Sequence, residues 1–97
     1  MNQKLVDTVV RSEERFDEGI SYSYKLLMRK GDSTVDWQLP LYSFRVSMID
    51  RDGIARHADA RDIFSDEEKA SAFFDKIVRN LATPIDLAYI IEDEMRS

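Results

Sequence analysis

The fold is decided by residues 60–78, ARDIFSDEEKASAFFDKIV, because the hydrophobic pattern changes its period within this stretch. Before Ser65, apolar residues alternate with polar ones, as in strands that bury one face. After Ser65 they recur roughly every 3.6 residues, as on the inner face of a helix. Strands followed by helices, with a single change between them, predict an α+β domain.

The helical half carries two start signals. Ser65 stands three residues before Glu68, the spacing of a capping box, and predicts a first helix from residue 65 to residue 81. Thr83 before Pro84 is an N-cap followed by proline at the first helical position, and it predicts a second helix ending near Met95. The predicted inner residues of the first helix are Ala70, Phe73, Phe74, Ile77, Val78 and Leu81. Those of the second are Leu87, Ala88, Ile91 and Met95, and its apolar stripe is widened by Ile85, Tyr89 and Ile90.

Before Ser65 the pattern predicts four strands, at residues 5–16, 20–29, 42–48 and 54–61. Residues 17–19 end in Gly19 and predict a three-residue bulged hairpin loop, which pairs Phe16 with Ile20 and places Val10 opposite Leu26 and Ser12 opposite Tyr24. Residues 30–36 are predicted to form a loop and residues 50–53 a turn. Pro40 cannot donate to a sheet, so the third strand is expected to begin after it or to lie at an edge there.

These elements predict one domain over residues 1–97, a four-stranded, mainly antiparallel sheet followed by two C-terminal helices on one face, in the order ββββαα. A meander is the simplest strand order, and a swapped edge strand is the alternative. Tyr22, Tyr24, Tyr42 and Phe44 alternate on facing strands. They are interpreted as the core beneath the helices rather than as a stacking platform for single-stranded nucleic acid.

Composition narrows the classes of function. The chain of 97 residues has 43% hydrophobic and 34% charged residues and no cysteine, which argues against thiol chemistry and favours a reducing cytoplasm. A net charge of -5 with scattered basic residues argues against nucleic-acid binding. Apolar runs are too short to span a bilayer, so no membrane role is expected.

Candidate chemistry is sparse. His57 is the one histidine, and the sequence shows no nucleophile beside it, so it is interpreted as structural or exposed. The acidic turn before Gly53 lacks the ligand spacing of a calcium loop. No catalytic, cofactor-binding or metal-binding residue is predicted, and no cofactor is expected.

Several apolar residues have the wrong parity for the core face. Leu27, Leu41 and Ile49 are predicted to lie on the open face of a two-layer domain. Together with Trp37, and with the surplus on the second helix, they predict an interaction surface. Its candidate residues are Leu27, Trp37, Leu41, Ile49, Tyr89 and Ile90.

The second half also carries a family resemblance. Residues 62–66, DIFSD, the start TPIDL at residues 83–87, and IED at residues 91–93 resemble a family of small bacterial proteins described as a domain of unknown function. The hairpin residues Ile20, Ser21, Tyr22 and Tyr24 are similar to the opening of that family. The resemblance implies a small cytoplasmic protein and assigns no activity.

Three functions are therefore left open. The first is a non-enzymatic protein-interaction or regulatory module, of which a homodimer is one form. The second is a small-ligand binding domain, with a pocket between sheet and helices lined by Tyr24, Tyr42 and Phe74. The third is an enzyme with an unrecognised site, such as His57 with Asp59 or Glu68. The missing chemistry favours the first.

Overall fold

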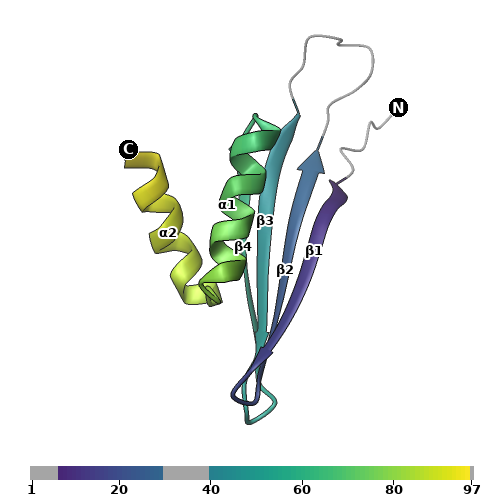
Figure 1. Ribbon diagram of the computed structural model, residues 1–97, viewed down its shortest axis with the longest axis vertical. Helices are drawn as coiled ribbons and strands as arrows, with labels where there is room; N and C mark the ends of the chain where they lie inside the picture. The colour runs from purple at the N-terminus through teal and green to yellow at the C-terminus, as the bar shows by residue number, and fades with distance from the viewer. Residues whose placement is uncertain (1–6, 30–39, 97) are drawn as a thin grey trace, which may run out of the picture.

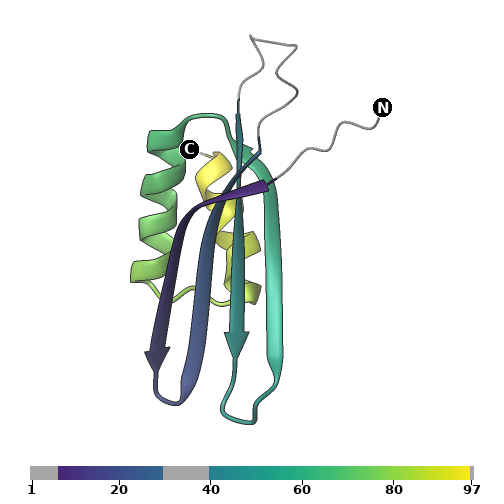
Figure 2. The same ribbon diagram turned by 90° about the vertical axis from the view of Figure 1, so that its right-hand side faces the viewer.

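The structure is a computed structural model that describes residues 7–29 and 40–96. Its elements are β1 (Asp7–Asp17), β2 (Ile20–Arg29), β3 (Leu41–Ile49), β4 (Ala55–Phe64), α1 (Glu67–Arg79) and α2 (Pro84–Arg96). The strands form one antiparallel sheet in the order β1-β2-β3-β4. Both helices cover the same face, and the other face is open (Figures 1 and 2). The predicted ββββαα fold and its meander are confirmed.

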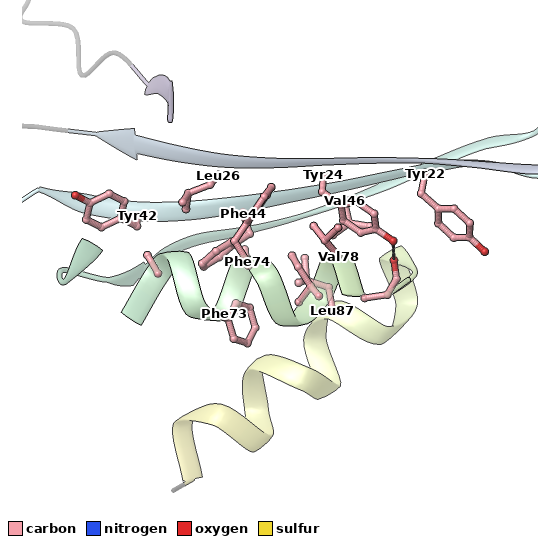
Figure 3. Close-up of a cluster of buried hydrophobic side chains, with 14 residues drawn as sticks. Tyr22, Tyr24, Leu26, Tyr42, Phe44, Val46, Phe73, Phe74, Val78 and Leu87 are labelled. Carbon is pink, nitrogen blue, oxygen red and sulfur yellow. Dashed lines mark hydrogen bonds between the residues drawn. The ribbon is translucent and has the colours of Figure 1, made fainter. Parts of the chain in front are cut away.

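The core lies between the sheet and the helices (Figure 3). Tyr24, Leu26, Phe44 and Val46 of the sheet are fully buried, and so is Phe74 of α1. The ring of Phe44 meets that of Phe73 at 4.9 Å between centroids. The aromatic residues of β2 and β3 therefore pack against the helices, as the sequence predicts for a core.

The β1–β2 hairpin differs from the prediction by one residue. Asp17 pairs with Ile20 and Phe16 with Ser21, so the loop holds two residues rather than three. Glu18 and Gly19 both have positive φ, 51° and 80°, which defines a type I′ turn. The register that pairs Phe16 with Ile20 is therefore wrong. Its cause is Glu18, because glutamate rarely adopts the left-handed conformation that this turn requires.

In this register, the side chains of β1 also face the opposite sides of the sheet from those predicted. Arg11, Glu13 and Arg15 stand opposite Leu26, Tyr24 and Tyr22, on the helix side of the sheet, while Phe16 lies on the open side and is 74% exposed. The Arg11 guanidinium is 2.8 Å from the carboxylate of Asp75 in α1 and 4.8 Å from the centre of the Phe74 ring. β1 therefore carries charged side chains on both of its faces, and it borders the core rather than adding to it.

The beginning of β1 bends across the open face of the sheet. The pairing with β2 shifts between Val9 and Arg11, and from there the strand crosses over its neighbours (Figure 2). This bend brings Asp7 within 3.3 Å of Arg61 on the opposite edge strand. Arg29 and Asp62 form a second ion pair on this side. The two edges of the sheet are thus linked at this end.

The β3–β4 hairpin agrees with the prediction in its outline. β3 begins after Pro40, as predicted. Asp50 forms the predicted turn, because its carboxylate accepts hydrogen bonds from the backbone N–H groups of Asp52 and Ile54, each at 2.9 Å. β4 extends to Phe64, beyond the predicted end at residue 61. An irregularity near its end leaves the Asp62 N–H to donate to the Ser43 hydroxyl at 2.9 Å.

Both helices begin close to their predicted starts. The N-cap of α1 is Asp66 rather than Ser65, and its carboxylate accepts the Glu68 N–H at 3.0 Å. Aspartate caps a helix as well as serine does, so the Ser65 capping box is wrong by one residue. Thr83 caps α2 as predicted, because its hydroxyl accepts the Asp86 N–H at 3.2 Å and the Asp86 carboxylate accepts the Thr83 N–H at 3.1 Å.

The first helix ends in a sharp turn. The Ala82 N–H donates to Ile77 O and the Leu81 N–H to Val78 O, the pair of bonds that defines a Schellman motif. Leu81 stands at the left-handed position of this motif with φ 50°, where glycine is usual. The carbonyl of Ala82 accepts the buried hydroxyl of Tyr24 at 2.8 Å. The turn between the helices is thereby fastened to the centre of the sheet.

Candidate functional surfaces

α2 is apolar on two sides. Toward the core, Leu87 is 1% exposed, and Ile90 and Ile91 are half-buried. On the opposite side Ile85, Tyr89 and Met95 are 65%, 67% and 53% exposed. These three residues, with the exposed Ala88, are called the outer α2 face.

Part of the predicted inner stripe of α2 is therefore wrong. Ala88 and Met95, expected inside, lie outside, and Ile90, expected on the interaction surface, packs against the core. The physical reason is the direction of the helix, since α2 leans away from the sheet toward its C-terminal end (Figure 1). Its last turn consequently has no sheet to pack against. Tyr89 is the predicted surface residue that stands well out from this helix.

The open face of the sheet holds the predicted surface residues Leu27, Leu41 and Ile49 in two places. Leu27 lies diagonally opposite Leu41, where β2 pairs with β3, and both are half-buried. Ile49 is 49% exposed and lies at the other end of β3, about 26 Å from Leu41 at the rise of an extended strand. Trp37 lies outside the described residues. The structure therefore does not bring Leu27, Leu41 and Ile49 into one patch.

A shallow depression of about 100 Å³ lies beside Ile49 on the open face. Three small side chains, Ser21, Ser23 and Ser47, form part of its lining together with Glu14. Phe16 belongs to the same end of the sheet, because it pairs with Ser21, which pairs in turn with Ile49. This end of the sheet thus combines exposed apolar groups with serines.

A larger cleft of about 480 Å³ lies between α1 and α2, where the end of β4 also lines it. Phe64, Ala72 and Phe73 line its apolar part, and Lys69, Lys76, Arg79 and Glu94 line its charged part. The Lys76 ammonium is 3.6 Å from a carboxylate oxygen of Glu94, so this pair joins the two helices across the cleft. Sequence reasoning missed this site. The available signal was the spacing of Lys69, Lys76 and Arg79, which places three cations on one side of α1.

The residues predicted to line a ligand pocket between sheet and helices lie in the core. Tyr24 and Phe74 are 0% exposed and Tyr42 is 3% exposed, and all three pack in the core (Figure 3). Burial raises the pKa of Tyr24 above its ordinary value, and burial, followed by the nearby carboxylates of Glu67 and Asp66, raises the pKa of Tyr42.

His57 pairs with Ser47 and is exposed on the open face of the sheet, whereas Glu68 belongs to α1 on the covered face. The two residues are therefore not brought together. Asp59 shares the open face with His57, and its carboxylate lies 3.3 Å from the Arg45 guanidinium. Within residues 7–29 and 40–96, no group of three or more His, Asp or Glu side chains could hold a metal ion. No helix in the described part of the chain is long and apolar enough to cross a membrane.

The fold defines the class of the protein as an α+β domain with a meander sheet and two helices on one face. The chain belongs to the family of unknown function DUF6514, whose model matches residues 3–97. This match confirms the resemblance to a domain of unknown function. No curated protein and no solved structure matches the chain.

Proposed function

We propose that this chain is a non-enzymatic protein-interaction module that pairs with a second copy of itself through the outer α2 face. The observation that carries the proposal is the exposure of Ile85, Tyr89 and Met95 on a helix whose opposite side is already buried in the core. A helix with one partner needs one apolar stripe, and the second stripe gains free energy only when another surface covers it.

A second copy suits this face because the helix can pair with itself around a twofold axis. In an antiparallel pair, Ile85 of one copy approaches Met95 of the other, with Ala88 and Tyr89 between them. Arg96 in the last turn, whose guanidinium is 2.6 Å from the Glu92 carboxylate of its own helix, then lies beside the first turn of the second copy, where Asp86 adds a further negative charge. The opposed helix dipoles favour the same arrangement.

The size of the face sets the strength of the pairing. A stable dimer usually buries about 800 Å² on each partner, and one side of a 13-residue helix provides less. The net charge of -5 on each copy adds repulsion. We therefore expect a reversible dimer that forms with increasing concentration and is strengthened by salt, which screens the repulsion.

Light scattering coupled to size-exclusion chromatography across a concentration series tests this proposal. The wild type should approach the dimer mass, and the double variant I85Q/Y89Q should remain monomeric. Ile54, 51% exposed in the β3–β4 turn, provides the matched control, and I54Q should dimerise as the wild type does. A wild type that stays monomeric at every concentration, or an I85Q/Y89Q variant that still dimerises, refutes pairing through α2.

If I85Q/Y89Q still dimerises, the variants L27Q and I49Q test the open face of the sheet. We also propose that the module acts in the bacterial cytoplasm, which the cysteine-free sequence supports.

A further inference from the structure

We propose that the cleft between α1 and α2 binds a small organic anion with a flat apolar body, such as an aromatic carboxylate or sulfonate. This site is separate from the outer α2 face, and its proposal does not depend on self-association. Its volume of about 480 Å³ falls in the range of about 300–1,000 Å³ that is usual for small-molecule sites.

The charge of the cleft selects an anion. Lys69, Lys76 and Arg79 give three positive charges against the single negative charge of Glu94 among its lining residues. This local excess is unusual in a protein whose net charge is -5. Lys76 is engaged by Glu94, whereas Lys69 and Arg79 form no ion pair with an acidic side chain within the described part of the chain. These two cations are therefore available to a ligand.

The apolar lining selects the body of the ligand. Phe73 is 3% exposed and Phe64 is half-buried, and their rings lie 5.6 Å apart between centroids. Phe73 forms the floor of the cleft, and the exposed Ala72 has a small side chain that leaves the half-buried ring of Phe64 open to a ligand. A flat apolar group covering this part of the cleft gains burial while its acidic group reaches Lys69 or Arg79.

The distance between the cations limits the length of the ligand. Lys69 and Arg79 are ten residues apart on α1, which is about 15 Å along the helix axis. A compact ligand of one or two rings spans only part of this distance, so it meets one cation at a time. Each of the two positions is therefore expected to contribute separately to affinity.

Fluorescence titration with anilinonaphthalene sulfonate tests the site, with phenylnaphthylamine as a neutral probe of similar shape. We expect the sulfonate to bind more tightly than the neutral probe, and to bind more weakly as salt is added. K69Q and R79Q should each raise its dissociation constant by no more than about twofold, because the other cation still offers a position, and the double variant K69Q/R79Q should raise it by about two- to fivefold, the range for partly exposed ion pairs. E94Q should lower it by a similar factor, because it removes the negative charge of the cleft.

Two control variants show whether the sulfonate binds in the cleft. Lys25 is exposed on the open face of the sheet, so K25Q removes one positive charge from the chain without touching the cleft and should bind as the wild type does. I85Q/Y89Q removes the outer α2 face and should also keep its affinity for the sulfonate. Equal affinity for the charged and neutral probes, or a double variant K69Q/R79Q that binds the sulfonate as K25Q does, overturns the proposal. Loss of sulfonate binding in I85Q/Y89Q overturns it as well, since the probe would then be reporting the outer α2 face.

Discussion

The hydrogen bond from Tyr24 to the turn between the helices yields the most direct test of the fold. The Tyr24 hydroxyl is fully buried and donates to the carbonyl of Ala82 at 2.8 Å, the dashed line in Figure 3. Tyr24→Phe removes the donor and leaves a buried carbonyl without it. Such a loss costs about 1–2 kcal/mol of unfolding free energy. For a chain of 97 residues this corresponds to a decrease in Tm of about 5–10 °C.

Urea unfolding followed by circular dichroism measures this cost. Tyr22→Phe is the matched control, because Tyr22 is 8% exposed on the same strand and its ring stacks with that of Tyr24. Its hydroxyl donates no hydrogen bond within the described residues, so its loss should change the unfolding free energy by less than about 0.5 kcal/mol. If Tyr24→Phe unfolds at the same urea concentration as Tyr22→Phe, the Ala82 bond does not stabilise the fold.

The same variant predicts a pH dependence. Burial raises the pKa of folded Tyr24 above 10.0, the value that the unfolded chain retains. The contribution of this residue to stability is therefore fully present below about pH 10 and is lost as the pH rises toward the folded pKa. Phenylalanine does not ionise, so the unfolding free energy of Tyr24→Phe has no such decrease. The difference in unfolding free energy between the wild type and Tyr24→Phe should therefore narrow between about pH 8 and about pH 11. A difference that stays constant over this range would contradict the raised pKa.

Three other substitutions test local features by thermal unfolding. Glu18→Asn should stabilise the chain by about 0.5–1 kcal/mol, since asparagine tolerates the left-handed conformation before Gly19; a lower Tm would refute the type I′ turn. Phe74→Ala should destabilise by about 3–5 kcal/mol, whereas Phe16→Ala, on an exposed side chain, should change little; equal effects would contradict the assigned core. Thr83→Ala should cost about 1 kcal/mol, and no change would show that its cap is dispensable.

The sequence was sufficient to predict the order of the elements because their signals are local. The change of period at Ser65 marks the boundary between sheet and helices, and Thr83 with Pro84 marks the second helix. The hairpin register was not predictable from residues 17–19. A three-residue loop ending in glycine and a two-residue Glu-Gly turn leave the same alternating pattern in β2, and only their pairing with β1 differs.

The candidate surfaces were harder to predict because they depend on how elements pack. The width of the apolar stripe on α2 indicates a surplus, but the direction in which the helix leans decides that Met95 is outside and Ile90 inside. The cleft could not be predicted from one element, because its walls come from both α1 and α2. Lys69 and Arg79 look like ordinary solvated residues of α1 until α2 forms the other wall.

The charges on both faces of β1 have a consequence for how copies of this chain can assemble. Any strand that tried to extend the sheet by hydrogen bonding to β1 would have to place its side chains beside Glu13 and Arg15 on one face and Glu14 on the other. Charged side chains on both faces of an edge strand oppose such pairing, because the side chains of the incoming strand would partly desolvate them. The charges of β1 thereby oppose growth of the sheet from copy to copy at this edge, whereas the pairing that we propose through α2 would be complete once two copies have met.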